Sequence, residues 1–210
     1  MMQTTSRDVL VVMDVQNDFC PGGALAIADG DSVIEVILRV APRFEHIVLT
    51  QDWHPVNHHS FASAHEGKRP FESIELRYGM QTLWPDHCVQ GTRGAAFHPS
   101  LYLPQAELIL RKGFRLDIDS YSAFFENDRL TPTGLAGYLR ERGLRRVFLA
   151  GLAYDHCVGY SALDARSLGL EAVIVRDACR AIDLDGSVAI IEAEFAKSGV
   201  ALVESPAVLV

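Results

Sequence analysis

The feature that most constrains the fold is a series of short apolar runs that do not alternate with polar residues. Each run is expected to form one buried strand, and the runs cover residues Val9–Met13, Ile47–Thr50, Leu108–Leu110, Val147–Ala150, Ala172–Val175 and Ala201–Val203. Continuous apolar runs are typical of strands that are covered on both faces, as in parallel sheets. The runs therefore predict a sheet of buried parallel strands.

Helical patterns lie between these runs. Residues Asp31–Arg43 carry apolar side chains at close to a 3.6-residue period, and three later segments end at or close to a glycine: Thr133–Arg142, Tyr154–Leu168 and Gly186–Lys197. Glycine is a common helix stop because it adopts a left-handed backbone without steric cost. The alternation of strands and helices predicts an open α/β sheet with right-handed crossovers.

The length of 210 residues and the apolar content of 49% are enough for one sizeable core, so we expect a single domain over residues 1–210. Residues 52–106 break the alternation, because they contain no convincing strand and hold six of the eight histidines. Long irregular connections inside compact domains are usually functional or disordered. This one mixes aromatic residues and prolines with polar residues, which favours an ordered, irregular insertion.

Charge and composition exclude several kinds of partner. The net charge of −8 argues against a nucleic-acid surface and fits a small neutral or cationic ligand. No apolar run approaches the roughly 18 residues of a membrane span, and the N-terminal MMQTTSRD lacks the pattern of a signal peptide. The four cysteines form no CxxC pair, so reduced thiols in the cytoplasm are expected. The apolar C-terminal VLV fits a subunit interface or a final sheet edge, which leaves a homo-oligomer open.

Ionisable residues follow four of the predicted strands. Asp14 follows the first run, Asp52 and His54 follow the second, Lys112 follows the third, and Asp155–Cys157 follow the fourth. Ligands of open α/β sheets bind at the carboxyl ends of the strands. Each of these residues alone fits a helix cap or a solvated loop equally well. Their coincidence predicts a functional site at one edge of the sheet.

Cys157, at the start of a predicted helix, has two possible roles. The commoner role of a free cysteine is to fill a small apolar space in the core. A nucleophile needs a lowered thiol pKa, which the backbone N–H groups of a first helical turn and a nearby lysine favour. Asp155, just before it, is a candidate N-cap of this helix. The stretch alone leaves both roles open.

Asp14 and Lys112 are candidates to act on that cysteine. An aspartate at the end of a buried strand either ties down a loop or serves as a general base near a nucleophile. Asp18, in the same VMDVQNDF segment, is the better candidate for a loop or cap residue. A lysine after a buried strand is costly unless a carboxylate pairs with it. An Asp14–Lys112 pair beside Cys157 would stabilise a thiolate, whereas Lys112 alone fits a surface loop.

A metal site is the sharper prediction. The triplet DWH places Asp52 and His54 at i and i+2, on the same side of an extended segment, and His87 in WPDHCVQGT adds a second imidazole. One carboxylate and two imidazoles suit a divalent ion such as Zn, Mn or Fe and leave positions open for water or substrate. His58 and His59 are spare candidates.

Five stretches, in chain order, carry a resemblance to one family: DVQNDFCPGGALAI, QDWHPVNHHSFAS, LWPDHCVQGTRGAAFHP, LRKGFRLDIDSYSAFFEN and GLAYDHCVGYSALDA. They resemble the successive motifs of the bacterial nicotinamidases, which belong to the isochorismatase-like cysteine hydrolases. The resemblance runs from residue 8 to about residue 180. It implies a three-layer α/β/α fold around a six-stranded parallel sheet. It also implies hydrolysis of nicotinamide to nicotinic acid and ammonia in NAD salvage, with pyrazinamide as a further substrate.

The resemblance assigns catalytic roles by motif. It implies a triad in which Cys157 is the nucleophile that forms a thioester, Asp14 is the base and Lys112 is the third member. It also implies a cis peptide bond between Leu152 and Ala153, which would aim the N–H groups of Ala153 and Cys157 at the substrate carbonyl oxygen as an oxyanion hole.

The same motifs assign the metal and the substrate pocket. By resemblance, Asp52, His54 and His87 hold one divalent metal ion, with zinc expected first, and His58 matches a ligand of some relatives and is held in reserve. Aromatic side chains are expected around the substrate ring, and by motif these are Phe19, Trp84 and Tyr121.

Three alternatives stay open. A related cysteine amidase of the same fold would act on another small amide, although the metal motif differs from that of isochorismatases and N-carbamoylsarcosine amidases. A metal–water hydrolase would leave Cys157 as a structural residue. A non-enzymatic zinc-binding or scaffold module would explain the metal residues, but not an aspartate, a lysine and a cysteine at three other strand ends.

Overall fold

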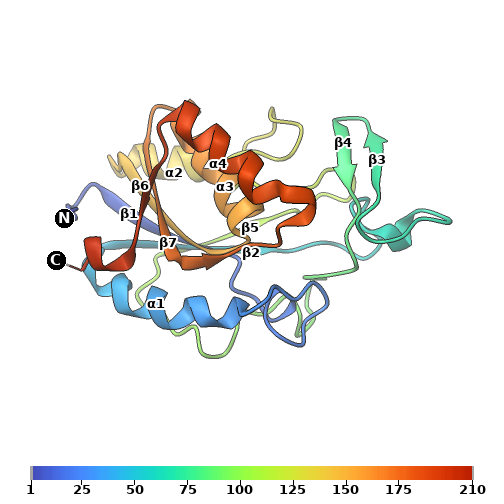
Figure 1. Cartoon of the computed structure of the whole chain (residues 1–210), viewed down its shortest axis with the longest axis horizontal. Helices are drawn as coiled ribbons and strands as arrows, with labels where there is room; N and C mark the ends of the chain where they lie inside the picture. Colours follow the sequence, from blue (N-terminus) through green and yellow to red (C-terminus); the bar gives the residue numbers. More distant parts are fainter. Residues whose placement is uncertain (1, 210) are drawn as a thin grey trace.

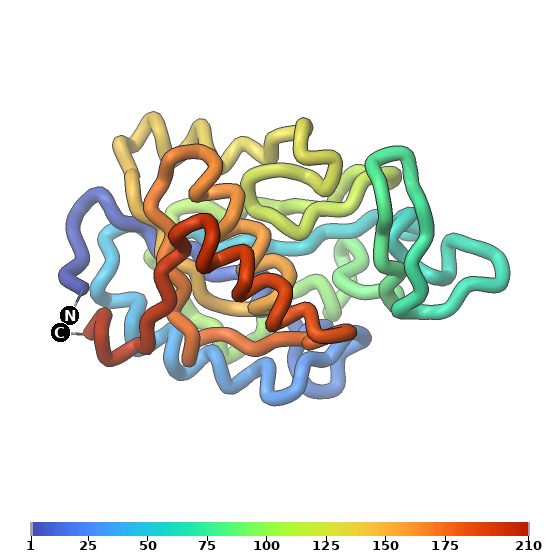
Figure 2. The backbone as a smooth tube through the Cα atoms, turned by 45° about the horizontal axis from the view of Figure 1, so that its top comes forward, coloured from blue at the N-terminus to red at the C-terminus, as the bar shows by residue number. Residues whose placement is uncertain are grey.

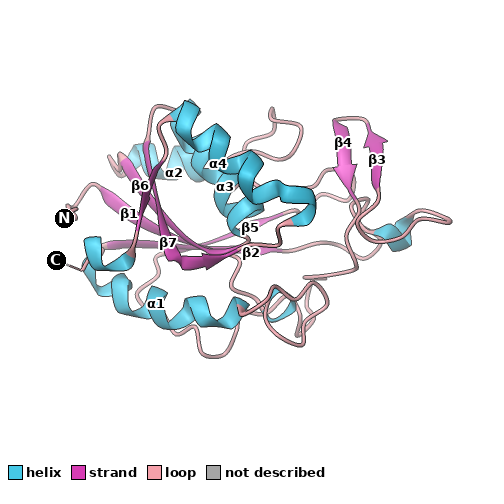
Figure 3. Ribbon diagram, in the orientation of Figure 1, coloured by secondary structure: helices cyan, strands magenta, loops and turns pink. Residues whose placement is uncertain are grey.

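The computed structural model describes residues 2–209 as a six-stranded parallel sheet with helices on both faces (Figures 1 and 3). The strands lie in the order β5-β2-β1-β6-β7-β8, and each neighbouring pair is parallel. The predicted three-layer α/β/α fold with six parallel strands is confirmed. The strand bounds are β1 Asp8–Met13, β2 His46–Asp52, β5 Leu108–Lys112, β6 Arg146–Leu152, β7 Glu171–Arg180 and β8 Ala201–Val203.

Two apolar cores lie on opposite faces of this sheet. Side chains of β1 alternate between them. Leu10 and Val12 lie in the core between the sheet and α1, and Val9 and Val11 lie in the core between the sheet and α2, α3 and α4. Figure 1 shows α1 below the sheet and the other three helices above it. Both faces of the central strands are therefore covered, as their continuous apolar sequences predict. The helix bounds are α1 Val33–Val40, α2 Leu135–Glu141, α3 Gly159–Ser167 and α4 Ser187–Ser198.

The helices lie where the sequence predicts them, and the first three, α1, α2 and α3, are shorter than predicted, whereas α4 has the predicted length. The helix expected over Asp31–Arg43 is α1 with a short 3-10 turn at each end. The helix expected over Tyr154–Leu168 divides into a π-helical turn, Tyr154–Val158, followed by α3. Single π turns occur frequently at functional sites, and this one carries Cys157.

The prediction that residues 52–106 contain no strand is wrong. An antiparallel hairpin of β3 (Ser73–Leu76) and β4 (Gly79–Thr82) projects beyond the end of the main sheet (Figure 2). Each strand has only four residues, and most of their side chains are exposed or half-buried. Four residues are too few for an alternation such as S-I-E-L in β3 to distinguish a strand from a loop.

The predicted site edge coincides with a switch point in the sheet topology. From β1 the chain continues outward through β2 and β5, and β6 then pairs with the opposite edge of β1. The segments that follow β1 and β6 leave toward opposite faces, which opens a crevice at the carboxyl ends of these two strands. Gly151 allows the strands to approach here, because at its φ of +118° a Cβ atom would collide with the Met13 carbonyl oxygen.

The two ends of the chain lie side by side (Figures 1 and 2), and the Met2 N–H donates to the Ala207 carbonyl at 2.8 Å. Val208, from the C-terminal VLV, is buried in the core under α1, and Val210 lies outside the described residues. Within residues 2–209, no helix has both the length and the apolar content needed to cross a membrane.

Candidate active site

The structure brings the three predicted triad residues together around one ammonium group. Lys112, the last residue of β5, is buried and lies 2.8 Å from Asp14 Oδ2 and 3.4 Å from Cys157 Sγ through its Nζ atom. The same Nζ donates to the Ser120 carbonyl oxygen at 2.9 Å. A buried lysine needs a carboxylate partner, and Lys112 has one in Asp14. The alternative interpretation of Lys112 as a lysine of a surface loop is wrong, because the side chain is buried.

Asp14 is held in an unusual backbone conformation directly after β1. Its φ is +47°, in the left-handed region that aspartate tolerates better than most residues. The Thr50 hydroxyl donates to Asp14 Oδ1 at 2.6 Å, and it also accepts from the Asp14 N–H at 3.1 Å. These two bonds fix the carboxylate with its second oxygen toward Lys112. Thr50 is a positioning residue that the sequence reasoning did not identify, because it lies inside an apolar run.

Burial dominates the proton affinities in this cluster. It raises the pKa of Asp14 above its usual value, with Lys112 opposing the shift. It also raises the pKa of the Cys157 thiol, although Lys112 lowers it in part. Burial alone would lower the pKa of Lys112, but Asp14 and Asp52 outweigh it and raise that pKa. The expectation of a low thiol pKa at a helix start is therefore wrong for this site: Cys157 carries its proton until a base removes it, and the lysine stays charged.

The predicted metal ligands also converge. Asp52, His54 and His87 each offer one ligand atom, and these atoms lie within 4.8 Å of one another. The Nε2 atoms of His54 and His87 lie 3.7 Å and 3.9 Å from Asp52 Oδ2. All three side chains are buried. A carboxylate and two imidazoles at these separations can surround one divalent ion.

The outer hydrogen bonds of the two imidazoles orient them for a metal. His54 Nδ1 faces the Gly113 carbonyl at 2.8 Å, and His87 Nδ1 faces the Pro85 carbonyl at 2.8 Å. Each Nδ1 therefore carries the proton, and each Nε2 presents a lone pair, as in histidine metal sites. Within residues 2–209, the buried His54 Nε2 has no hydrogen-bond partner. This unpaired nitrogen, together with one carboxylate and a second imidazole, fits a divalent metal ion.

The three histidines of this region, His54, His58 and His87, differ in their pKa values and in their hydrogen bonds. Burial, aided by His54, lowers the pKa of His87 to about 4, which keeps it neutral. Burial would lower the pKa of His54 as well, but Asp52 and Asp119 outweigh it and raise that pKa. His58, the reserve ligand, has both ring nitrogens engaged, because Nδ1 lies 2.7 Å from Ser60 Oγ and Nε2 lies 3.3 Å from the Ile118 carbonyl.

A pocket opens beside the triad and the metal cluster. The predicted aromatic residues Phe19, Trp84 and Tyr121 all line it, together with Cys157. Trp84 Nε1 donates to the Tyr121 hydroxyl at 3.0 Å, which locks these two rings together. Further lining residues that the sequence reasoning did not assign to the pocket are Leu25, Asp119, His156 and Ile182.

The backbone around the nucleophile follows the predicted arrangement. The peptide bond between Leu152 and Ala153 is cis, as the resemblance implies. The Ala153 carbonyl accepts from the N–H groups of His156 and Val158, the residues on either side of Cys157. Ala153 and Cys157 both line the cavity. Their use as an oxyanion hole remains a prediction.

Asp155 does not cap its own helix, which corrects the N-cap prediction. Its carboxylate instead accepts from the N–H groups of Ile182 and Asp183, at 3.0 and 2.8 Å, and from the Ser187 hydroxyl. Asp155 therefore anchors the loop after β7, which contributes Ile182 to the cavity wall. Asp18, by contrast, is a loop residue as predicted, since it accepts from the N–H groups of Ala24 and Cys88.

Comparisons with known proteins agree with this geometry. The chain is 53% identical to the nicotinamidase of Acinetobacter baylyi over 209 residues, which cover 100% of this chain and 98% of that protein. A solved structure of an Acinetobacter baumanii nicotinamidase/pyrazinamidase superposes with a TM-score of 0.97 at 53% identity, covering 98% of this chain and 99% of that one. The zinc complex of the Pyrococcus horikoshii pyrazinamidase superposes with a TM-score of 0.74 at 34% identity, covering 94% and 99%.

The sequence profile of the isochorismatase domain matches residues 8–205. This match spans every strand of the sheet and all of the candidate site residues. Together with the full-length identity to the Acinetobacter baylyi enzyme, it assigns the fold and the site to one family. The chain belongs to the isochorismatase domain family.

Proposed function

We propose that the protein is a nicotinamidase, an amidohydrolase that converts nicotinamide to nicotinic acid and ammonia. The observation that carries the proposal is the position of Lys112, whose ammonium contacts Asp14, Asp52 and Cys157. This ammonium contacts the proposed nucleophile Cys157, the proposed base Asp14 and the proposed metal ligand Asp52, beside a cavity that is lined by aromatic side chains. The identity of 53% to a nicotinamidase supports the choice of substrate.

The reaction begins with a proton transfer inside the triad. Asp14 takes the thiol proton from Cys157, whose Sγ atom lies within 4.8 Å of a carboxylate oxygen of Asp14. Burial raises the pKa of both groups, so the carboxylate is a stronger base than an exposed aspartate. Lys112 stays charged and stabilises the thiolate as it forms.

The thiolate then attacks the carboxamide carbon. The carbonyl oxygen becomes an oxyanion, which the N–H groups of Ala153 and Cys157 stabilise by about 3 kcal/mol for each donor. Asp14 returns its proton to the amide nitrogen, the C–N bond breaks, and ammonia leaves. Cys157 now carries a nicotinoyl thioester.

Hydrolysis of the thioester repeats these steps with water. Asp14 removes a proton from the attacking water, and the same N–H groups hold the second oxyanion. The C–S bond breaks, the thiol recovers its proton from Asp14, and nicotinic acid is released. Each turnover consumes one water and returns the triad to its starting protonation state.

Asp52, His54 and His87 would hold one divalent ion, and the zinc complex of the Pyrococcus horikoshii relative makes zinc the first candidate. When bound, this ion would coordinate the pyridine nitrogen and orient the ring. The rings of Phe19 and Trp84 enclose the flat substrate from the cavity wall. Pyrazinamide, which has the same carboxamide and ring nitrogen, is a further expected substrate, as the name of the Acinetobacter baumanii relative indicates.

We place the enzyme in the cytoplasm, in NAD salvage. Cys20, Cys88, Cys157 and Cys179 are all free and buried, which fits a reducing compartment. The product, nicotinic acid, is a precursor that salvage enzymes re-use.

The test is ammonia and nicotinic acid release by the purified protein, beside its Cys157→Ala variant and with metal content measured for both. The proposal predicts stoichiometric release of both products by the parent, and metal retention without turnover by the variant. A folded, metal-replete parent that releases no ammonia from nicotinamide would redirect the assignment to another small amide. Equal release by both proteins would move the chemistry away from the cysteine.

A further inference from the structure

Ser161 is a fully buried serine on α3, one helical turn after the nucleophile. Its hydroxyl donates to the Cys157 carbonyl oxygen at 2.6 Å. The Ser161 hydroxyl oxygen in turn accepts from the Ala123 N–H at 2.8 Å, across a sequence separation of 38 residues. The side chain therefore ties the turn that carries the thiol to a loop from a distant part of the chain.

That loop also holds the catalytic ammonium. Three residues before Ala123, the Ser120 carbonyl accepts from Lys112 Nζ at 2.9 Å. Tyr121, between them, forms part of the cavity wall. A shift of this loop relative to α3 would consequently change the position of Lys112 relative to Cys157, whose Nζ–Sγ distance is 3.4 Å.

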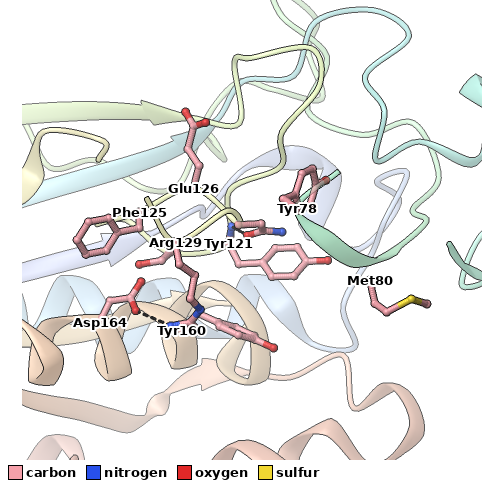
Figure 4. A pocket seen from close by; sticks show the side chains of 10 residues that line it. Tyr78, Met80, Tyr121, Phe125, Glu126, Arg129, Tyr160 and Asp164 are labelled. Carbon is pink, nitrogen blue, oxygen red and sulfur yellow. Dashed lines mark hydrogen bonds and ion pairs between the residues drawn. The ribbon is translucent and has the colours of Figure 1, made fainter. Parts of the chain in front are cut away.

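The loop that carries Ser120 and Ala123 packs against α3 along a contact that we call the seam. Ser161 forms the buried part of this seam. Figure 4 shows the outer part, where Tyr121 and Phe125 of the loop face Tyr160 and Asp164 of α3. Arg129 closes the seam with an ion pair to Asp164 at 3.0 Å, drawn as a dashed line. The Arg129 side chain is 57% exposed, so this pair is screened by water and contributes little to holding the seam. The two bonds of Ser161 are not screened in this way.

We propose that Ser161 is a positioning residue of the reaction, which fixes the loop carrying Ser120 against the π turn and thereby sets the distance between Lys112 and Cys157. Within residues 2–209, the buried Ala123 N–H has no acceptor other than the Ser161 hydroxyl. Removing that hydroxyl leaves a buried donor unsatisfied, so the loop has to move or admit water. Because the same loop also holds Lys112 through the Ser120 carbonyl, a movement of the loop changes the distance between the Lys112 ammonium and the Cys157 thiolate.

The role in turnover rests on the proposed nicotinamidase function, and kinetics of three variants test it. Ser161→Ala removes both bonds, and Ser161→Thr keeps a hydroxyl that can bond the same carbonyl from a helix. Ser167→Ala is the matched control, because Ser167 on the same helix makes the same kind of bond, to the Asp164 carbonyl at 2.8 Å, away from the nucleophile. Rates are expressed per folded enzyme, with thermal unfolding recorded for each variant.

We expect Ser161→Ala to lower kcat by about 10- to 100-fold with KM changed by less than about threefold, since misplacing a reacting group by about 1 Å has effects of this size. Ser167→Ala and Ser161→Thr should stay within about threefold of the parent. The proposal is overturned if Ser161→Ala keeps the parent kcat or raises only KM. It is also overturned if the threonine variant loses as much kcat as the alanine variant at the parent's thermal midpoint, because the hydroxyl would then be irrelevant.

Alkylation by iodoacetamide separates this proposal from the choice of substrate. The rate of labelling of the Cys157 peptide, followed by mass spectrometry at neutral pH, depends on the lysine beside the thiol and requires no turnover. We expect Ser161→Ala to slow this labelling on the order of tenfold, and Ser167→Ala to leave it unchanged. A parent that releases no ammonia would refute the proposed function alone, whereas unchanged labelling in Ser161→Ala would refute the positioning role alone.

Discussion

Asp52 and Lys112 form a buried ion pair in which Asp52 Oδ1 accepts from Lys112 Nζ at 2.5 Å. The other oxygen of the same carboxylate, Oδ2, faces the imidazoles of His54 and His87. One side chain thus belongs both to the metal cluster and to the charge environment of the thiol. The two oxygens of Asp52 give the metal cluster and the triad a shared charge.

This shared charge predicts that two ligand variants both lose metal but differ in the reactivity of Cys157. Burial is the main cause of the raised pKa of Cys157, and the negative charge of Asp52 adds to it, so Asp52→Asn should abolish metal binding and still accelerate alkylation of Cys157 several-fold. His87→Ala removes a ligand that does not touch Lys112, and it should weaken metal affinity by more than about 100-fold with alkylation unchanged. Metal content by elemental analysis and labelling rates on metal-free protein provide the measurements. Slower alkylation in Asp52→Asn would contradict the electrostatic account.

The lysine itself should be a large determinant of stability. Lys112→Met leaves the carboxylates of Asp14 and Asp52 buried without their cation, and breaking a buried pair from one side costs about 3–5 kcal/mol of unfolding free energy. Urea denaturation of the metal-free protein measures the change. Lys197→Met, which removes an exposed pair with Glu194 on α4, is the matched control and should change the midpoint little. Equal effects of the two substitutions would show that the buried cluster does not need its cation.

Asp155 gives a pH-dependent contribution to stability. Burial would raise the pKa of its carboxyl, but His156, Ser187 and the Ile182 N–H outweigh burial and lower that pKa below its usual value. A lowered folded-state pKa stabilises the fold above the unfolded-state pKa of about 3.9, and this stabilisation is lost as the pH falls below that value. Asp155→Asn should therefore lower the free energy of unfolding by about 1–3 kcal/mol at pH 7, with a smaller deficit near pH 3.

Urea denaturation at a series of pH values checks this prediction. Asp185→Asn, an exposed position in the same loop, serves as the control and should show no such pH-dependent deficit. A deficit of Asp155→Asn that is the same at pH 7 and pH 3 would mean that the charge of the carboxylate is not what anchors the loop.

The sequence predicted those parts of the molecule whose signals are periodic or sit at strand ends. Buried runs such as Val9–Met13 could be identified as strands because both of their faces are covered. The positions of Asp14, Lys112 and Cys157 after such runs placed them at one edge of the sheet. The resemblance then supplied the roles and the cis peptide bond, which no local pattern indicates.

The rest depends on contacts between segments that are distant in the chain. The strands of the β3–β4 hairpin have only four residues each, which is too short for their alternation to stand out from a loop. Asp155 looked like a helix cap, but the backbone N–H groups that donate to its carboxylate lie 27 and more residues away. Ser161 and Thr50 act through bonds to segments more than 30 residues distant. The raised pKa of Cys157 follows mainly from its burial in the folded protein, which a sequence does not state.

The most direct test of the central claim is to trap the covalent intermediate. The parent protein is mixed with nicotinamide, quenched in acid within the first turnovers, digested, and examined by mass spectrometry. The account predicts a nicotinoyl thioester on the peptide that carries Cys157, and no adduct and no turnover in Cys157→Ala. Rapid turnover without any adduct in the parent, together with ammonia release by Cys157→Ala, would contradict it and assign the chemistry to a metal-bound water.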